Sequence, residues 1–135
     1  MSFFSGFKKK KVSAQGALVL AAMSIILSDN DVDYDEVGVL HRLINNGNAD
    51  ESLDELYEIY NSFNKVGDLV EFVSNSLDAR QRLTVMANIL DIAMADGILA
   101  ENEKLLIELY LNEFQMNFSD IDSIIDVIVV KNMSL

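Results

Sequence analysis

Apolar residues recur at helical spacing along almost the whole chain. Between 17 and 27 they occupy nearly every position, which is typical of a helix buried on several sides. The later segments are amphipathic, with apolar residues three and four positions apart on one face. The pattern predicts helices that begin near Ser13, Asp33, Ser52, Asp68, Asp78, Ala100 and Ser119. The first of these, which we expect to end near Leu27, should lie at the centre of the fold.

Most of these starts carry the residues of a capping box, in which two side chains three positions apart each bond the other's backbone N–H. The predicted boxes are Asp33 with Glu36, Ser52 with Glu55, Asp68 with Glu71, Asp78 with Gln81, and Ser119 with Asp122. The second helix should end near Ile44, where Gly47 can take the left-handed conformation. The apolar stripes predict that Tyr57, Leu83, Leu105 and Leu109 are packed inward.

An internal repeat links two parts of the chain. A shift of 67 positions places Asp29 on Asp96 and Glu36 on Glu103 (96 − 29 = 67). Each turn reads Asp-(Asn or Gly)-x-aliphatic-x-x-x-Glu and follows an apolar helical run, at 17–27 and 83–94. We therefore predict an all-α, single-domain bundle of about seven helices with two pseudo-repeated units of helix, acidic turn and helix.

The composition supports this fold class. The 135 residues include no proline and only six glycines, so little interrupts a helix, and a chain of this length can bury one core. The β-branched run at 128–130 could form a strand by propensity, but no second strand is predicted to pair with it. The absence of cysteine excludes disulfides, thiolate metal sites and cysteine nucleophiles.

Charge divides the chain into a basic tail and an acidic body. The formal net charge is −12, yet four lysines lie at 8–11 and the first acid is Asp29. We interpret residues 1–11 as a tail and 12–135 as the domain, whose six basic residues and 22 acids give −16. Such a domain repels nucleic-acid phosphates and attracts cations or a basic protein partner, so nucleic-acid binding is not expected.

The tail also bears on location. Phe3, Phe4 and Phe7 precede the lysines at helical spacing, so one interpretation is weak peripheral contact with an anionic membrane surface. The favoured interpretation is that the phenylalanines fold back onto the domain, because one short amphipathic turn anchors weakly. The apolar run that follows is short for a membrane-spanning helix and lacks a signal-peptide cleavage pattern. We expect a cytoplasmic protein, with contact at the inner face of the membrane as the further option.

The acidic turns are the candidate functional residues. Oxygen ligands at this density suit a hard divalent cation such as calcium, magnesium or manganese. The candidate ligands are Asp29, Asp31, Asp33, Glu36, Asp96, Glu101 and Glu103. An EF-hand loop that began at Asp29 would need glycine at its sixth position and glutamate at its twelfth, where this chain has Tyr34 and Leu40. The turns are therefore not EF-hands.

A simpler interpretation explains many of the same acids. Asp33 and Glu36 can cap a helix, acids in a first helical turn are favoured by the helix dipole, and Asp29 and Asp96 can stabilise tight turns. The caps leave Asp31, Asp35 and the repetition of the motif unexplained. Both interpretations stay open from the residues alone.

Enzymatic chemistry lacks candidates. His41 is the only histidine, no serine lies in a nucleophile-elbow pattern, and no glycine-rich phosphate loop is present. Asp91 lies on the far side of its helix from the apolar stripe and is expected to be solvated. We expect a protein that is not an enzyme.

The same turns resemble a known family. An opening MSFF, the segment SDNDVDYDE at 28–36 and the segment IAMADGILAENEK at 92–104 are similar to the tellurite-resistance protein TerB family. The resemblance implies a helical fold of about seven helices in two pseudo-repeats, no known catalytic activity and an acidic surface proposed to bind metal ions. It carries over to Asp29, Glu36, Asp96 and Glu103, and more weakly to Asp31, Asp33 and Glu101.

Two departures from the family pattern concern the turns. Asn30 replaces the glycine of the first turn, which asparagine tolerates, and Ala100 replaces the acid or hydroxyl expected at the second helix start. The resemblance thus predicts a domain that binds a divalent cation through paired acidic turns, within a tellurite-resistance, stress-response or membrane-linked assembly. The alternative is a metal-free interaction module whose acidic face recognises a basic partner. The sequence specifies no oligomeric state.

Overall fold

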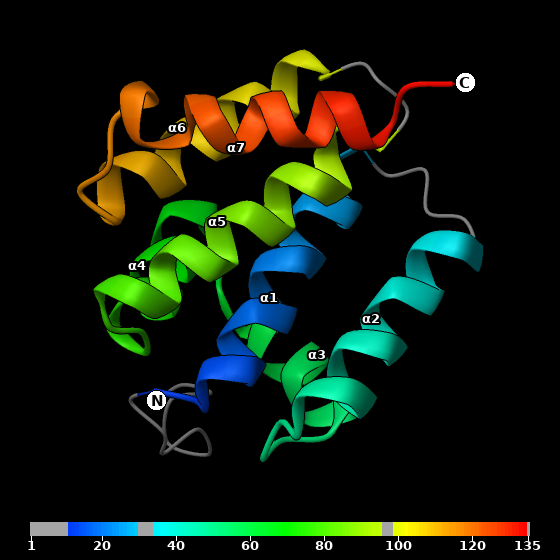
Figure 1. Ribbon diagram of the computed structural model, residues 1–135. Helices are drawn as coiled ribbons and strands as arrows, with labels where there is room; N and C mark the ends of the chain where they lie inside the picture. Colours follow the sequence, from blue (N-terminus) through cyan, green and yellow to red (C-terminus); the bar gives the residue numbers. More distant parts are fainter. Residues whose placement is uncertain (1–10, 30–33, 96–98, 135) are drawn as a thin grey trace.

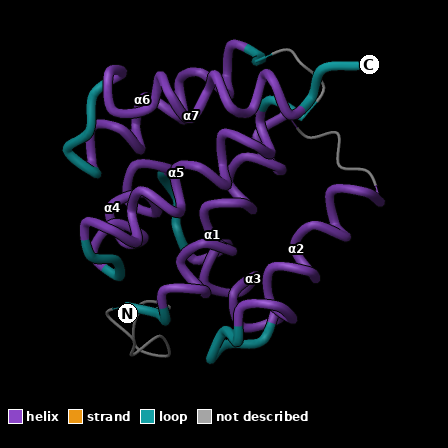
Figure 2. Tube along the Cα trace, in the orientation of Figure 1, coloured by secondary structure: helices purple, strands orange, loops and turns teal. Residues whose placement is uncertain are grey.

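The computed structural model describes residues 11–29, 34–95 and 99–134. Within these ranges the chain forms seven α-helices and one short 3-10 turn, without a strand (Figures 1 and 2). The elements are α1 (Ala14–Ile26), η2 (Leu27–Asp29), α2 (Tyr34–Gly47), α3 (Leu53–Ser62), α4 (Val66–Asn75), α5 (Ala79–Ala93), α6 (Glu101–Glu113) and α7 (Phe118–Lys131). The prediction of an all-α bundle is confirmed.

Helix α1 forms the centre of the core. Every residue from Gly16 to Ile26 is buried, and α1 packs against α2, α3, α4 and α5 (Figure 1). A helix surrounded in this way needs apolar residues on all faces, which explains why the run shows no polar side. The second group of helices forms around α5, which packs against both α6 and α7, while α4 packs against α6.

The internal repeat extends further than the turns. Helices α2 and α6 begin at Tyr34 and Glu101, which are 67 positions apart (101 − 34 = 67). The same shift places α1 within α5 and α3 within α7. Each half is therefore a set of three helices, and α4 is the one helix of the described ranges without a counterpart.

Two of the predicted capping boxes form and two do not. Ser52 with Glu55 and Asp78 with Gln81 make both reciprocal bonds at the starts of α3 and α5. The predicted box of Asp68 with Glu71 is wrong, because α4 begins at Val66 with no side-chain cap at Lys65. The box of Ser119 with Asp122 is wrong by two residues, because Asn117 and Asp120 form it instead. The frame that starts α7 at Phe118 buries Ile121 and Ile128. The fifth predicted box includes Asp33, which lies outside the described residues.

Helix α2 also ends later than predicted. It continues past Ile44 through Gly47, and Asn48 rather than Gly47 takes the left-handed conformation, with φ 54°. Gly47 serves a different purpose, because a Cβ there would lie 1.9 Å from Cδ of Gln15. The Gln15 amide donates a hydrogen bond of 2.7 Å to the carbonyl of Leu43. Gly47 therefore allows α1 and α2 to approach closely.

Four residues predicted to pack inward are exposed instead. They are Tyr57 (53% exposed), Leu83 (44%), Leu105 (57%) and Leu109 (37%). Other predicted core residues of α3, α5 and α6, such as Leu56, Met86 and Tyr110, are buried as predicted. The buried positions that were not predicted are Ile59, Val85, Ile107 and Leu111. The apolar residues in these helices cover more than one face, so spacing alone leaves the direction of the core undetermined. The contacts with α1 and α4 decide it.

A buried hydrogen bond connects α1 to α6. The hydroxyls of Ser24 and Tyr110 lie 2.7 Å apart, and the Ser24 hydroxyl donates to the carbonyl of Ala21. Tyr110 is therefore the donor to Ser24. Burial raises the pKa of Tyr110 above its usual 10.0; the hydrogen bond with Ser24 lowers it in part, and the nearby Tyr60 raises it further.

This buried phenol predicts a loss of stability at alkaline pH. Below pH 10 the folded and unfolded chains both hold the proton, whereas above it only the unfolded chain releases it, so folding becomes less favourable. We expect the free energy of unfolding to fall by about 1.4 kcal/mol per pH unit above pH 10 from this group. Urea denaturation of wild type and Tyr110→Phe between pH 9 and 11 measures it. A Tyr110→Phe variant that loses stability as steeply as wild type would contradict the assignment.

Candidate functional site

The start of the first acidic turn lies next to the start of α6, the helix that follows the second turn. The turn η2, which ends at Asp29, contacts α6. The side-chain amide of Asn102 in α6 donates a hydrogen bond of 2.8 Å to the carbonyl of Ser28. Ser28 immediately precedes Asp29, so this bond ties the start of the first turn to the helix that follows the second.

A second contact holds the other end of the second turn. Asn132, which follows α7, donates its side-chain amide to the carbonyl of Met94 at 3.4 Å. One helical turn earlier in α5, Asp91 forms an ion pair of 2.7 Å with Lys131. Asp91 faces away from the core, as predicted, and is partly exposed. The sequence did not indicate its cationic partner, because Lys131 is 40 positions away (131 − 91 = 40).

The structure describes only some of the predicted ligands. Asp31, Asp33 and Asp96 lie outside the described residues, and for Asp29 and Glu36 only the backbone is described. Asp29 ends η2, and Glu36 lies in the first turn of α2. The side chains of Glu101 and Glu103 are described in full.

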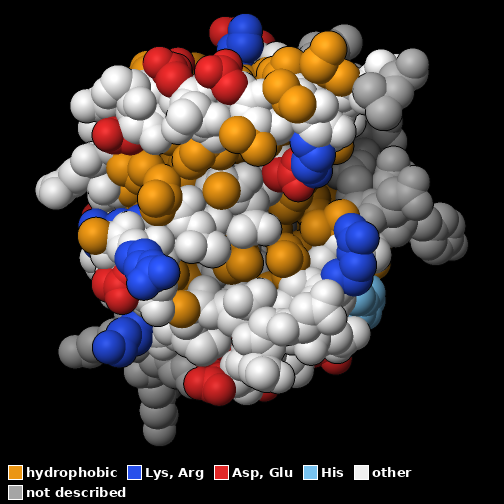
Figure 3. All heavy atoms as spheres, viewed as in Figure 1, with side chains coloured by type: hydrophobic (Ala, Val, Ile, Leu, Met, Phe, Trp, Pro, Cys, Tyr) orange, Lys and Arg blue, Asp and Glu red, His pale blue; other side chains and the backbone are white. Residues whose placement is uncertain are grey.

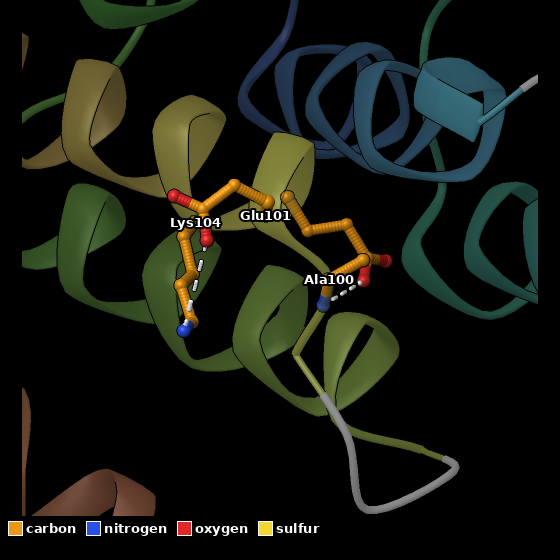
Figure 4. A network of polar contacts seen from close by, with 4 residues as sticks. Ala100, Glu101 and Lys104 are labelled. Atoms are coloured by element: carbon orange, nitrogen blue, oxygen red, sulfur yellow. Dashed lines mark hydrogen bonds and ion pairs between the residues drawn. The ribbon is translucent and has the colours of Figure 1, made fainter.

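Glu101 and Glu103 have different surroundings at the start of α6. The Glu101 side chain is 83% exposed and lies 3.9 Å from Nζ of Lys104, a weak surface pair (Figure 4). A carboxylate oxygen of Glu103 accepts the backbone N–H of Ala100 at 3.0 Å. Ala100 itself has no acceptor side chain, so half of the capping box is present. Glu103 therefore helps to start α6, whereas Glu101 is directed to solvent.

No cation site is complete among the described side chains. In the described ranges, no three carboxylate or histidine side chains gather in a way that could hold a metal ion. A site at the turns therefore needs carboxylates from 29–36 and 96 together with Glu101. His41 is exposed on α2 and belongs to no such cluster.

A buried carboxylate far from the turns is a feature that sequence reasoning missed. Glu51 is 3% exposed, and its two oxygens accept the backbone N–H of Ser13 at 3.0 Å and the Ser13 hydroxyl at 2.6 Å. The Ser13 hydroxyl in turn accepts the N–H of Gly16, as an N-cap does. Glu51 thus performs the role that a local glutamate plays in a capping box, and we assign it to the fold rather than to binding.

Gly16 provides the room for this carboxylate. It occupies the position three residues after the cap, where the glutamate of a local box would stand. A Cβ at Gly16 would lie 2.4 Å from Oε1 of Glu51, closer than any real contact. The sequence indicates this contact only locally, through a capping serine at position 13 and a glycine three residues later. No sequence pattern identifies Glu51 as the partner of Ser13.

The helices in the described ranges include none that is long and apolar enough to cross a membrane. This finding agrees with the interpretation of the first apolar run as a core helix. The role of residues 1–10 lies outside the described part of the chain.

Comparison with known proteins gives one match. The family model described as Tellurite resistance protein TerB matches residues 15–125. The match runs from the first turn of α1 to the middle of α7 and includes both acidic turns. No curated protein and no solved structure matches the chain. Because the family model covers most of the sequence, the resemblance is confirmed and the chain belongs to the TerB family.

Proposed function

We propose that this non-enzymatic TerB domain binds a divalent cation at its paired acidic turns. The observation that carries the proposal is the hydrogen bond from Asn102 to the carbonyl of Ser28, which joins the start of the first turn to the first turn of α6. Turns 67 positions apart in the sequence can then supply ligands to one ion. Asp29 and Asp31 from the first turn and Asp96 and Glu101 from the second are the principal ligands in this proposal.

The environment of the described carboxylates supports the assignment. Glu101 is only weakly paired, because Nζ of Lys104 lies 3.9 Å away and both side chains are more than half exposed. The domain has 22 acids against six basic residues from position 12 onward, so it attracts cations. Glu103 is the weaker candidate, since its carboxylate already accepts a backbone N–H.

Titration calorimetry with calcium, magnesium and manganese tests the proposal. We expect binding with a dissociation constant of about 0.1–1 mM, the range of weak calcium modules. The double variant Asp29→Asn with Asp96→Asn should weaken binding by about tenfold or more, because it removes one carboxylate from each turn. The matched control is Asp54→Asn with Asp122→Asn, which makes the same change in charge at exposed positions on α3 and α7.

The companion variant Asn102→Ala tests the positions of the carboxylates separately from their charge. It leaves every carboxylate in place but removes the bond to Ser28, and we expect weaker cation binding than in wild type. Equal loss of affinity in the control pair would show that general charge, rather than the turns, attracts the ion. An absence of heat with all three metals at millimolar concentration would rule out the cation proposal.

The alternative is a metal-free module that recognises a basic partner through the same acidic face. It predicts that a lysine-rich peptide binds in a salt-sensitive manner and that an excess of chelator leaves this binding unchanged. Loss of binding in the Asp29→Asn, Asp96→Asn variant under these conditions would favour it.

Whether the ligand is a cation or a basic protein, we propose that the domain acts in a tellurite-resistance or stress-response assembly at the inner face of the membrane. Residues 1–11 would make the contact with the membrane.

A further inference from the structure

A groove separate from the acidic turns runs between α2 and α5 on the face shown in Figure 3. Its volume is about 650 Å³, within the range of small-molecule sites. Leu18 of α1, Leu43 of α2 and Ile92 of α5 supply apolar lining. In the space-filling view, hydrophobic side chains gather in a hollow between these helices (Figure 3).

The groove is formed by how α1 holds its neighbours. Both α2 and α5 pack against α1, which forms the bottom of the groove. The hydrogen bond from Gln15 to the Leu43 carbonyl and the close approach of Gln15 to Gly47 fix the position of α2. On the other side, the Asp91–Lys131 ion pair fixes the rim where α5 meets α7. The walls are therefore set by contacts within the chain, without a ligand.

The charge of the groove is opposite to that of the whole chain. Arg42 on the α2 wall is exposed and forms no ion pair with another residue in the described ranges. Lys131 on the opposite rim is neutralised by Asp91. Among the described side chains, the groove thus carries one uncompensated positive charge, in a chain of net charge −12. Asn46, Asn88 and Asn132 add neutral polar groups to its lining.

We propose that this groove binds an amphiphilic monocarboxylate, with its apolar chain on the lining and its carboxylate on Arg42. A guanidinium presents paired donors that match a carboxylate, which makes Arg42 the recognition residue for the head group. The acidic field of the domain repels polyanions, so an occupant with a single negative charge is favoured over an acidic protein or a nucleic acid. This site is independent of the cation proposal, since none of the groove residues named here belongs to the predicted metal ligands.

Calorimetric titration of the full chain with laurate tests the proposal. Laurate is kept below its micelle concentration, and excess chelator is present. We expect one laurate per chain. The variant Arg42→Gln should weaken binding by about tenfold, because it replaces the charge-assisted contact. Arg80→Gln is the matched control, since Arg80 is exposed in the first turn of α5 and does not line the groove; its affinity should stay within about twofold of wild type.

Two further probes distinguish the groove from general adsorption. Dodecyltrimethylammonium, which has the same chain length and the opposite charge, should bind more weakly than laurate. Val39→Glu places a carboxylate on the α2 wall and should abolish laurate binding while the helical circular dichroism is retained. The proposal is overturned by equal weakening in Arg42→Gln and Arg80→Gln, by preference for the cationic amphiphile, or by binding of many laurate molecules per chain. Binding of an acidic amphipathic peptide in place of laurate would also overturn it.

Discussion

Replacing Glu51 with alanine should lower the free energy of unfolding by about 3–5 kcal/mol, because two bonds to a buried carboxylate are lost together. Glu51 accepts both the backbone N–H and the hydroxyl of Ser13, and its side chain is 3% exposed. Without it, these donors at the start of α1 lose their acceptor. Since α1 is the central helix, urea denaturation should show a lower midpoint for the whole cooperative transition.

Glu55→Ala is the matched control for this variant. Glu55 makes a similar bond to the backbone N–H of Ser52, but in an exposed local capping box, so its loss should cost about 1 kcal/mol. Gly16→Ala tests the same buried contact from the other side, because the new Cβ would displace the Glu51 carboxylate. A Glu51→Ala variant no less stable than Glu55→Ala would contradict the role of Glu51 in supporting the Ser13 cap of α1.

Glu51 also shows where local sequence patterns fail to predict the fold. The boxes of Ser52 and Asp78 were predictable because both partners lie within four residues of each other. The cap of α1 joins positions 38 apart, and no local pattern indicates that the chain brings them together. The predicted start of α7 at Ser119 was wrong for a related reason. Residues 117–122 contain two overlapping candidate capping boxes, Asn117 with Asp120 and Ser119 with Asp122. The burial of Ile121 and Ile128 selects the first of them.

The candidate site was predictable to a similar extent. The repeat and the family resemblance identified both acidic turns from the sequence, because the motif residues are local. The contact between the start of the first turn and α6 includes the bond from Asn102, and the repeat does not predict this bond. The equivalent position in the first motif, 67 residues earlier, is Asp35 (102 − 35 = 67). The groove was not predictable, since its lining comes from four helices and its charge is hidden by the acidic total.

Burial in α6 needed tertiary information for a different reason. Six of the seven residues at 105–111 are apolar, and they cover most of the circumference of the helix. Periodicity then cannot decide which side faces inward. The helix packs against α4 and α5, which buries Leu106 and leaves Leu105 57% exposed.

A pair of leucine substitutions tests this account of the core. Leu20→Ala should lower the free energy of unfolding by about 3–5 kcal/mol, because Leu20 is fully buried in α1 and surrounded by helices that cannot easily close the cavity. Leu105→Ala removes the same atoms from an exposed position and should change stability by about 0.5 kcal/mol or less. Urea denaturation of wild type and both variants measures the difference. We expect the slope of the unfolding free energy against urea concentration to be the same in all three proteins.

The comparison is informative because the two substitutions are chemically identical. The effect at Leu105 reports the orientation of α6, and Leu20 in α1 provides the reference value for a fully buried leucine. Equal losses of several kcal/mol would place Leu105 inside the core, as its spacing predicted, and would require α6 to be rotated. A small effect at Leu20 would instead remove α1 from the centre of the fold, on which the positions of both the acidic turns and the groove depend.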